Sequence, residues 1–179
     1  MRKDLTKTLL TPRLRIEPLT PRLGAIAQQG PGALAEAIDA DVPPEWSNAG
    51  GLRLLARSGR DVPKSAERAL VVHRGDERVI GDLKFEPVNA AHRDTIELGY
   101  SITALYRRQG YASEAAGGLL AWAFEEAGIV QVIAGCHRGN KGSVCTLRKL
   151  GFWLDGARGD DFWWTLSAEL FARNHAGEI

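Results

Sequence analysis

The chain has 179 residues, of which 44% are hydrophobic and 25% charged, a composition that predicts one folded domain over residues 1–179. Its formal net charge is +1, so no overall charge attracts nucleic acid or a membrane surface. The two cysteines, Cys136 and Cys145, lack the spacing of a disulfide framework or a zinc site, and we expect no bound metal.

The N-terminal part of the chain predicts one strand followed by several short helices. Only Leu9 and Leu10 precede a polar stretch, which is too short for a signal peptide, and no run approaches the roughly 20 apolar residues that span a bilayer. We therefore expect a cytoplasmic protein. Arg13 to Leu19 alternates polar and apolar residues, as a strand does. Leu23 to about Arg60 predicts short helices and loops, because Gly and Pro interrupt it repeatedly.

Three strands form the centre of the predicted fold. Glu67 to Arg74 and Arg78 to Glu86 are joined by a turn at Gly75-Asp76, which indicates a hairpin. A third strand, Thr95 to Ile102, follows a polar loop. Strands in this succession predict an antiparallel meander.

Helical periodicity begins after these strands. Apolar residues recur on one helical face from Ser113 to Ala127, and Gly128 ends the pattern. Strands and helices then alternate, which places the chain in the α/β class. The remaining predicted elements are a strand at Val130–Cys136, a helix at Lys141–Leu150 and a closing hairpin of Phe152–Leu154 and Phe162–Leu166 around Gly156–Asp160.

The segment that opens the long helix has the features of an anion site. A strand, a glycine turn and a helix N terminus gather unpaired backbone N–H groups at the positive end of the helix dipole. Gly110 lets the backbone approach a phosphate, the small Ala112 does nearly the same, and Arg107 and Arg108 add charge-assisted contacts suited to a pyrophosphate or a nucleotide 3′-phosphate. The alternative interpretation, an ordinary turn whose arginines are exposed to solvent, stays open. Neither a P-loop nor a dinucleotide-binding fingerprint is present.

Four motifs occur in a fixed order around this segment. They are Glu97-Leu98-Gly99-Tyr100, Arg107-x-x-Gly110-x-Ala112 with its continuation Ser113-Glu114-Ala115, Asn140-x-x-Ser143, and Lys149-Leu150-Gly151-Phe152. In this order and spacing the chain resembles the GNAT superfamily of N-acetyltransferases, and specifically the RimJ/RimL-type branch that acetylates ribosomal-protein N termini. The resemblance covers roughly Glu67 to Leu166.

The resemblance implies a GNAT fold, with a mixed, mostly antiparallel sheet of about seven strands that is splayed at the acetyl-CoA cleft and flanked by helices. It implies acetyl-CoA as the co-substrate. In the family, the backbone of the splayed strand pairs with pantetheine, the loop amides hold the pyrophosphate, and an asparagine binds pantetheine from the opposite side. The residues assigned to the cofactor in this way are Tyr100, Ser101, Ile102, Arg107, Arg108, Gln109, Gly110, Tyr111, Ala112, Ser113 and Asn140.

Acetyl transfer also needs a base for the amine, a donor to the thioester oxygen and an acid for the departing thiolate. A backbone N–H near Ile102 fits the donor. Many family members use a tyrosine as the acid, but Leu147 stands at that position. We therefore assign the acid to Ser143. A role of this serine as a helix cap stays open as the alternative. We assign the base to Glu97, which strand alternation places on the face of Ser101. An ion pair on the sheet stays open for Glu97.

Several further residues have alternative interpretations. Asp82 and Glu86 are alternative bases, Cys145 is expected to be a small core residue rather than a nucleophile, and the four histidines are expected at the surface or in hairpins. Candidates for the acceptor groove, each also compatible with a core or solvated role, are Trp46, Phe162, Trp163, Trp164, Glu45, Asp160 and Asp161.

The expected reaction is transfer of an acetyl group from acetyl-CoA to a primary amine, by resemblance a protein or peptide α-amine. A small-molecule amine such as an antibiotic or polyamine stays open as the acceptor, as does a CoA-binding module without catalysis. We expect neither a nucleic-acid nor a membrane partner, and a homodimer stays open.

Overall fold

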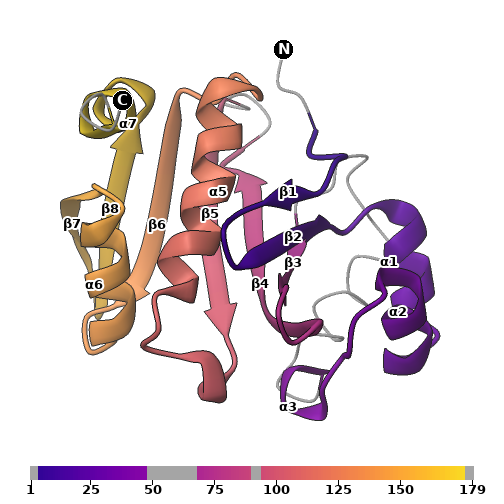
Figure 1. Cartoon of the computed structure of the whole chain (residues 1–179). Coiled ribbons are helices and arrows are strands. Elements are labelled where there is room, and N and C mark those ends of the chain that lie inside the picture. Colours follow the sequence, from indigo (N-terminus) through magenta and orange to yellow (C-terminus); the bar gives the residue numbers. More distant parts are fainter. Residues whose placement is uncertain (1–3, 48–67, 90–93, 176–179) are drawn as a thin grey trace. The chain divides into compact units, whose positions relative to one another are not determined.

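The computed structural model describes residues 4–47, 68–89 and 94–175. None of the helices in these residues is long and apolar enough to cross a membrane. The helices are α1 (Pro21–Ala27), α2 (Pro31–Ile38), α3 (Pro44–Trp46), the 3-10 turn η2 (Ala104–Tyr106), α5 (Tyr111–Glu125), α6 (Lys141–Lys149) and α7 (Ala168–His175). The strands are β1 (Leu9–Leu10), β2 (Leu14–Pro18), β3 (Arg68–His73), β4 (Arg78–Pro87), β5 (Thr95–Ile102), β6 (Gln131–His137), β7 (Trp153–Arg158) and β8 (Asp161–Ser167) (Figure 1).

The strands form one mixed sheet in the order β1-β2-β3-β4-β5-β6-β8-β7. The strands β5 and β6 run parallel. The pairs β1–β2, β2–β3, β3–β4, β6–β8 and β7–β8 are antiparallel. This confirms the mixed, mostly antiparallel sheet that the sequence predicts. The sheet has eight strands rather than about seven. The additional strand is β1, whose two residues are too few to show an alternating pattern.

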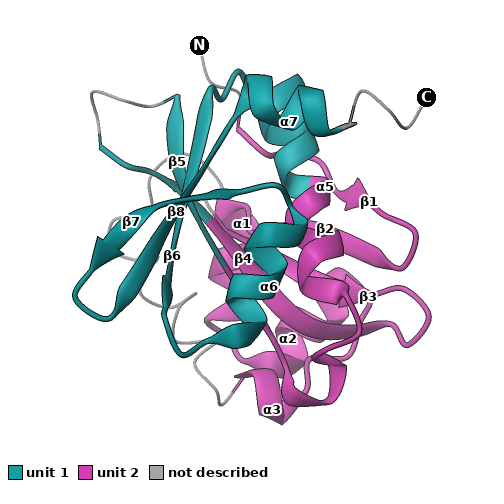
Figure 2. Cartoon of the chain, turned by 90° about the vertical axis from the view of Figure 1, so that its left-hand side faces the viewer, with its two compact units in different colours: residues 1–3, 85–99, 119–179 teal, residues 4–84, 100–118 magenta. Residues whose placement is uncertain are grey.

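The chain divides into two compact units, each built from separate stretches of sequence (Figure 2). Unit 1 comprises residues 1–3, 85–99 and 119–179, and unit 2 comprises residues 4–84 and 100–118. The strands β4 and β5 and the helix α5 each contribute residues to both units.

Unit 2 packs α1, α2 and α3 against one face of its strands. Alternation along β2 buries Leu14 and Ile16, as predicted. Thr20 caps α1 by accepting a hydrogen bond from the Leu23 N–H. The two helices α1 and α2 lie side by side (Figure 1). Their apolar residues join those of α3 and the strands in one buried cluster: Leu19, Ala27, Leu34, Ile38, Ala40, Val42, Trp46, Leu70, Val72 and Val79.

Unit 1 contains the C-terminal strands and helices. The strand β8 pairs along its whole length with β6, from Ser167 opposite Gln131 to Asp161 opposite His137. Helix α7 follows β8 directly and was not predicted; it is anchored by Phe171, whose ring lies 5.0 Å from that of Phe124 on α5.

The predicted element boundaries differ from the structure mainly at the closing hairpin. Its loop was predicted at Gly156–Asp160, but β7 continues to Arg158 and β8 begins at Asp161, so the turn is much tighter. The glycine that makes it is Gly159, at φ +59°. The predicted helical region from Leu23 to Arg60 is seen as three short helices up to Trp46, and its remainder from residue 48 lies outside the described residues.

Candidate acetyl-CoA site

The predicted anion loop joins η2 to the N terminus of α5. Arg108 and Gly110 both adopt positive φ angles, +58° and +85°, which turns the chain sharply into the helix. A residue with a side chain at position 110 would be strained, so the backbone favours glycine there. The helix that follows runs from Tyr111 to Glu125, and its first amide groups have no partner within the helix. The loop therefore has the backbone geometry of an anion site.

Arg107 ties this loop to the end of β5. Its Nε donates a hydrogen bond of 2.7 Å to the carbonyl oxygen of Ile102. Arg107 and Arg108 are both exposed. The loop is thereby held next to Ser101 and Ile102, the residues assigned to pantetheine.

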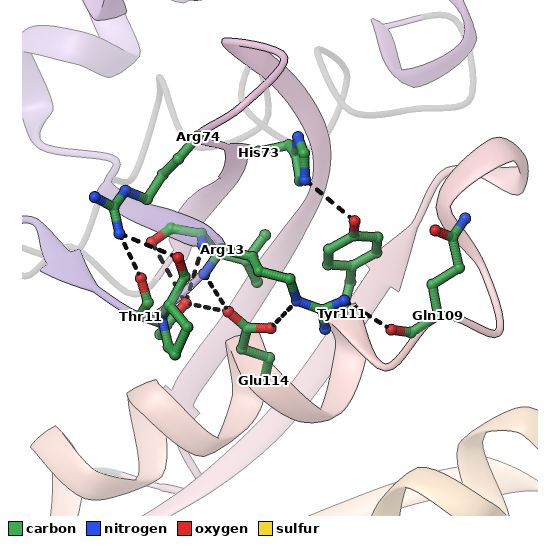
Figure 3. A network of polar contacts seen from close by, with 9 residues as sticks. Thr11, Arg13, His73, Arg74, Gln109, Tyr111 and Glu114 are labelled. Carbon is green, nitrogen blue, oxygen red and sulfur yellow. Dashed lines mark hydrogen bonds and ion pairs between the residues drawn. The ribbon is translucent and has the colours of Figure 1, made fainter.

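A second set of contacts holds the loop from the N-terminal segment (Figure 3). Glu114, in the first turn of α5, accepts hydrogen bonds from Thr11 Oγ1 at 2.6 Å, the Arg13 N–H at 2.8 Å and Arg13 Nε at 2.7 Å. Burial raises the pKa of Glu114, but these hydrogen bonds outweigh it, so the pKa lies below its ordinary value. Arg74 donates to the main-chain oxygens of Thr11 and Pro12 and fixes the segment itself.

An aromatic cluster supports the loop and was missed at the level of sequence. The Tyr111 hydroxyl lies 3.1 Å from His73 Nε2, and the rings of Tyr106 and Tyr111 both contact the imidazole. Tyr106 donates to Asp76 Oδ2 at 2.6 Å, and this hydrogen bond, with burial, raises the pKa of Tyr106 to about 12. His73 was expected to be a surface or hairpin residue; it lies in the hairpin of β3 and β4, opposite Arg78, and is half-buried because it contacts the loop.

The strand β5 presents its residues as alternation predicts. Ile96, Leu98 and Ile102 are buried, whereas Glu97 is half-buried and Ser101 exposed. Glu97 and Ser101 therefore share a face. The parallel ladder with β6 ends at the pair Glu97–Ile133, before Ser101 and Ile102 are reached. The ladder stops where the resemblance implies that the strands separate.

On the same face of β5, Ser101 Oγ donates to Asp82 Oδ2 at 2.8 Å. The buried indole Nε1 of Trp46 donates to the same oxygen at 3.0 Å. Asp82 thus binds two neutral donors from different elements of unit 2, which stabilise its carboxylate without cancelling its charge.

Helix α6 carries the remaining predicted residues. Asn140 is its N-cap, and its Oδ1 accepts from the Ser143 N–H at 3.1 Å. This cap uses one of the two lone pairs of Oδ1, and Nδ2 is the donor of the Asn140 side chain. The N-cap position of α6 is thus occupied by Asn140, and Ser143 lies three residues later in the first turn. Leu147, at the position where family members have tyrosine, is buried, with 1% of its surface exposed.

A model of the family described as "Acetyltransferase (GNAT) domain" matches residues 13–153. The chain belongs to the GNAT acetyltransferase family. It is 29% identical over 156 residues to the uncharacterized N-acetyltransferase YjdG of Bacillus subtilis, a match that covers 82% of this chain and 90% of YjdG.

Solved structures of acetyltransferases share the fold. The crystal structure of the ribosomal-protein-S5-alanine acetyltransferase from Vibrio fischeri superposes with a TM-score of 0.61 at 15% identity, covering 91% of this chain and 97% of that one. Mutant forms of the spermidine/spermine N-acetyltransferase SpeG from Vibrio cholerae superpose with a TM-score of 0.57 at 16% identity, covering 68% and 79%. As a GNAT protein, the chain is an acetyl-CoA-dependent N-acetyltransferase.

The predicted site residues of this GNAT enzyme fall into both compact units. The loop and its supports, together with Ser101 and Ile102, belong to unit 2. Glu97, Asn140 and Ser143 belong to unit 1. Within residues 4–47, 68–89 and 94–175, no three His, Cys, Asp or Glu side chains gather where they could hold a metal.

The structure separates the aromatic residues that were candidates for the acceptor groove. Trp46 and Trp164 are buried, at 3% exposure each, and belong to the core. Phe162 and Trp163 are half-buried, and the Trp163 ring lies against Gly135 on β6, with the Arg158 guanidinium 5.1 Å from its centroid. Of the four, Phe162 and Trp163 are the ones that retain accessible surface for an acceptor.

Two of the candidate acidic residues have cationic neighbours. Glu45 pairs with Arg78 at 2.7 Å, and this hydrogen bond lowers the pKa of Glu45. Asp160 lies 3.5 Å from Arg138 Nε. Asp161 is exposed at the start of β8. Cys145 is exposed on the outer face of α6, so the expectation that it is a core residue is wrong.

Proposed function

We propose that this acetyltransferase transfers an acetyl group to the α-amine of a protein or peptide N terminus. The four ordered motifs support this class of acceptor, because they resemble the branch that acetylates ribosomal-protein N termini. The likeness to the ribosomal-protein-S5-alanine acetyltransferase of Vibrio fischeri is in keeping with it.

The observation that carries the cofactor half of the proposal is the loop at the N terminus of α5. Positive φ angles at Arg108 and Gly110 and the small Ala112 leave the amides from residue 108 to residue 113 accessible to a pyrophosphate. Their N–H groups, with the exposed guanidinium groups of Arg107 and Arg108, fit an anion of this charge. Gln109, Tyr111 and Ser113 contribute through the main chain. The residues present therefore fit acetyl-CoA.

Two further groups would hold the pantetheine arm. The main chain of Tyr100, Ser101 and Ile102 would pair with it, since the ladder to β6 has ended at Glu97. Asn140 would bind it from the start of α6, where Nδ2 can donate while Oδ1 accepts the Ser143 N–H of the cap.

Acetyl-CoA supplies an activated thioester, and the chain's residues move the protons. Glu97 takes a proton from the incoming ammonium group, directly or through a water, so that a neutral amine attacks the thioester carbonyl carbon. A main-chain N–H near Ile102 donates to the carbonyl oxygen as its charge grows. The carbon–sulfur bond then breaks as the nitrogen loses its second proton, and Ser143 gives its hydroxyl proton to the departing thiolate of CoA while it regains the proton released by the nitrogen, directly or through water. The products are the N-acetylated acceptor and CoA.

The acceptor class is tested by measuring free thiol release from acetyl-CoA with a panel of amines. The panel contains peptides that differ in their first residue, the same peptides with blocked N termini, polyamines and aminoglycosides. We expect turnover with some free N termini and none with the blocked peptides. Turnover with small amines alone would replace the peptide acceptor by a small-molecule one. Binding of CoA without turnover on the whole panel would favour a CoA-binding module.

The catalytic assignments are tested by Glu97→Gln and Ser143→Ala. Each change is expected to lower kcat by about 100-fold or more, the usual contribution of general acid–base catalysis. Ser143→Thr keeps a hydroxyl and should retain most of the activity. Glu169→Gln, in the first turn of α7, is the matched carboxylate control and should behave as the wild type. Unchanged kcat in both test variants would remove Glu97 and Ser143 from the mechanism.

A further inference from the structure

Arg13 contacts the predicted anion loop, Arg107 to Ala112, from a distant part of the sequence; this segment is called the cofactor loop below. Its Nη1 donates to the carbonyl oxygen of Gln109 at 3.1 Å, across a separation of 96 residues. Its Nη2 lies so close to Gly110 that a Cβ atom there would be 3.4 Å away. The guanidinium carbon lies 4.1 Å from the centroid of the Tyr111 ring (Figure 3). Arg13 therefore contacts three consecutive residues of the loop.

The contact with Gln109 determines the direction of one peptide group. In a trans peptide the C=O of one residue and the N–H of the next point in opposite directions, and the described residues contain no cis bond. Since the Gln109 C=O points at Arg13, the Gly110 N–H points away from Arg13. A glycine permits this peptide to flip at low cost, because Gly110 accepts both signs of φ. A flipped peptide would present an oxygen instead of an N–H and would repel an anion.

Arg13 also offsets the negative charge closest to the loop along the chain. Glu114 lies in the first turn of α5, where an unpaired carboxylate would oppose the binding of a pyrophosphate. Arg13 Nε and the Arg13 N–H occupy both of its oxygens, at 2.7 and 2.8 Å. The pair is partly shielded, since the Glu114 side chain is only 15% exposed.

We propose that Arg13 is a positioning residue for the cofactor, which holds the 109–110 peptide in its anion-binding direction and neutralises Glu114. This inference rests on the proposed binding of acetyl-CoA by the loop. It assigns to the segment before β2 a part in cofactor affinity.

The test compares CoA with pantetheine, which lacks the pyrophosphate and the nucleotide. The dissociation constant of CoA is measured by calorimetry, and that of the weaker ligand pantetheine by ligand-observed NMR. Arg13→Gln is expected to raise the dissociation constant of CoA by about tenfold to 100-fold, as expected for loss of charge-assisted hydrogen bonds. The value for pantetheine should stay within about twofold, because only the loop is disturbed.

Two further variants separate positioning from a general loss of stability. Arg13→Lys keeps the charge but cannot form hydrogen bonds to Glu114 and Gln109 at the same time. It should raise the dissociation constant of CoA by a smaller factor, about threefold to tenfold. Arg15→Gln is the matched control: Arg15 lies on β2, pairs with Glu17 at 3.2 Å and donates to the Ile38 oxygen. It should bind CoA as the wild type does.

The outcomes distinguish this inference from the proposed function. If the wild type itself does not bind CoA, the proposed function fails. If the wild type and Arg13→Gln bind CoA equally well, the positioning role is overturned. It is also overturned if Arg13→Gln weakens the binding of CoA and of pantetheine by the same factor. If Arg13→Gln does not fold, the comparison of Arg13→Lys with Arg15→Gln decides in the same way.

Discussion

The Tyr111 hydroxyl lies 3.1 Å from Nε2 of His73, so the first residue of α5 is tied to the end of β3. The other ring nitrogen of His73 accepts the Asp76 N–H at 3.1 Å, which extends the contact to the turn between β3 and β4. Tyr111 is 7% exposed, so the phenol and imidazole depend on one another for hydrogen bonding. A tyrosine inside the cofactor loop is thus anchored by a residue that is far away in sequence.

Tyr111→Phe should lower the free energy of unfolding by about 1 kcal/mol, since one hydrogen bond between partly buried groups is lost without a large change in packing. Urea unfolding measures this loss. A stability equal to that of the wild type would mean that water replaces the Tyr111 hydroxyl as the hydrogen-bond partner of His73.

Tyr106 should ionise far above the ordinary range for a phenol. The hydrogen bond to Asp76 raises the pKa of Tyr106 to about 12. The folded chain then holds this proton while the unfolded chain releases it near pH 10, so stability falls as the pH rises from about 10 to about 12. A titration of phenolate absorbance should show this late transition, and Tyr106→Phe should remove it. Asp76→Asn should move the transition toward the ordinary value.

Glu114→Gln should destabilise the chain in a manner that depends on pH. The wild-type carboxylate has a lowered pKa, so its contribution is complete above the ordinary value of 4.5 and is lost as the pH falls through the folded value. Near neutral pH we expect a loss of about 1 to 2 kcal/mol, because a partly buried acceptor of three hydrogen bonds is weakened. Urea unfolding at neutral and acidic pH should show the difference shrinking in acid. Glu125→Gln, at the exposed end of the same helix, should show no such pattern.

Gly81→Ala should be strongly destabilising, because a Cβ at this position would overlap the main-chain carbonyl oxygen of Ser101. Neither β4 nor β5 can move away easily, because both lie inside the sheet. We expect the free energy of unfolding to fall by about 3 kcal/mol. Gly24→Ala is the control: it lies in α1 with no atom within 4 Å of the added carbon, so a gain of about 0.5 to 1 kcal/mol is expected. Thermal unfolding of both variants provides the comparison, and a tolerated Gly81→Ala would show that β4 and β5 can shift apart.

Asp82→Ala should cost about 1 to 3 kcal/mol, since it removes the acceptor of the buried Trp46 indole N–H. Asp82→Asn keeps an acceptor oxygen and should cost clearly less. Urea unfolding followed by tryptophan fluorescence measures both. Equal losses in the two variants would show that the charge of Asp82, rather than its hydrogen bonds, stabilises this part of unit 2.

Much of the fold was predictable from short stretches of sequence. The bounds of β5 agree with the prediction at both ends, because its alternation is bracketed by a polar loop and a turn. The long helix was also predicted, but it begins at Tyr111 rather than Ser113. The reason is that Tyr111 and Ala112, read as loop, already lie in the first helical turn. The helix α7 was missed, although Ser167 accepts the Leu170 N–H in its first turn, and its packing through Phe171 depends on a contact with Phe124.

The candidate site was predictable only in part. Gly110 was identified because a glycine lets the backbone approach a phosphate, and Asn140 because the family resemblance assigns it to pantetheine. Only the structure shows the positive φ of Gly110 and the position of Asn140 as the N-cap of α6. His73, by contrast, was expected only as a surface or hairpin residue, and nothing near it in sequence indicates Tyr111 as its partner. Cys145 was assigned to the core, whereas the periodicity of α6 turns Leu147 inward and Cys145 outward.

The sequence by itself predicted the family, the glycine turn before α5 and the order of most elements, because each depends on residues close to one another along the chain. Tertiary structure decided what holds the loop in place. Arg13 and Glu114 are 101 residues apart, and a salt bridge between such distant residues leaves no periodicity or spacing that a single sequence can show. The direction of the 109–110 peptide follows from a second contact of Arg13, its hydrogen bond to the Gln109 carbonyl oxygen, so it became visible only in the folded chain.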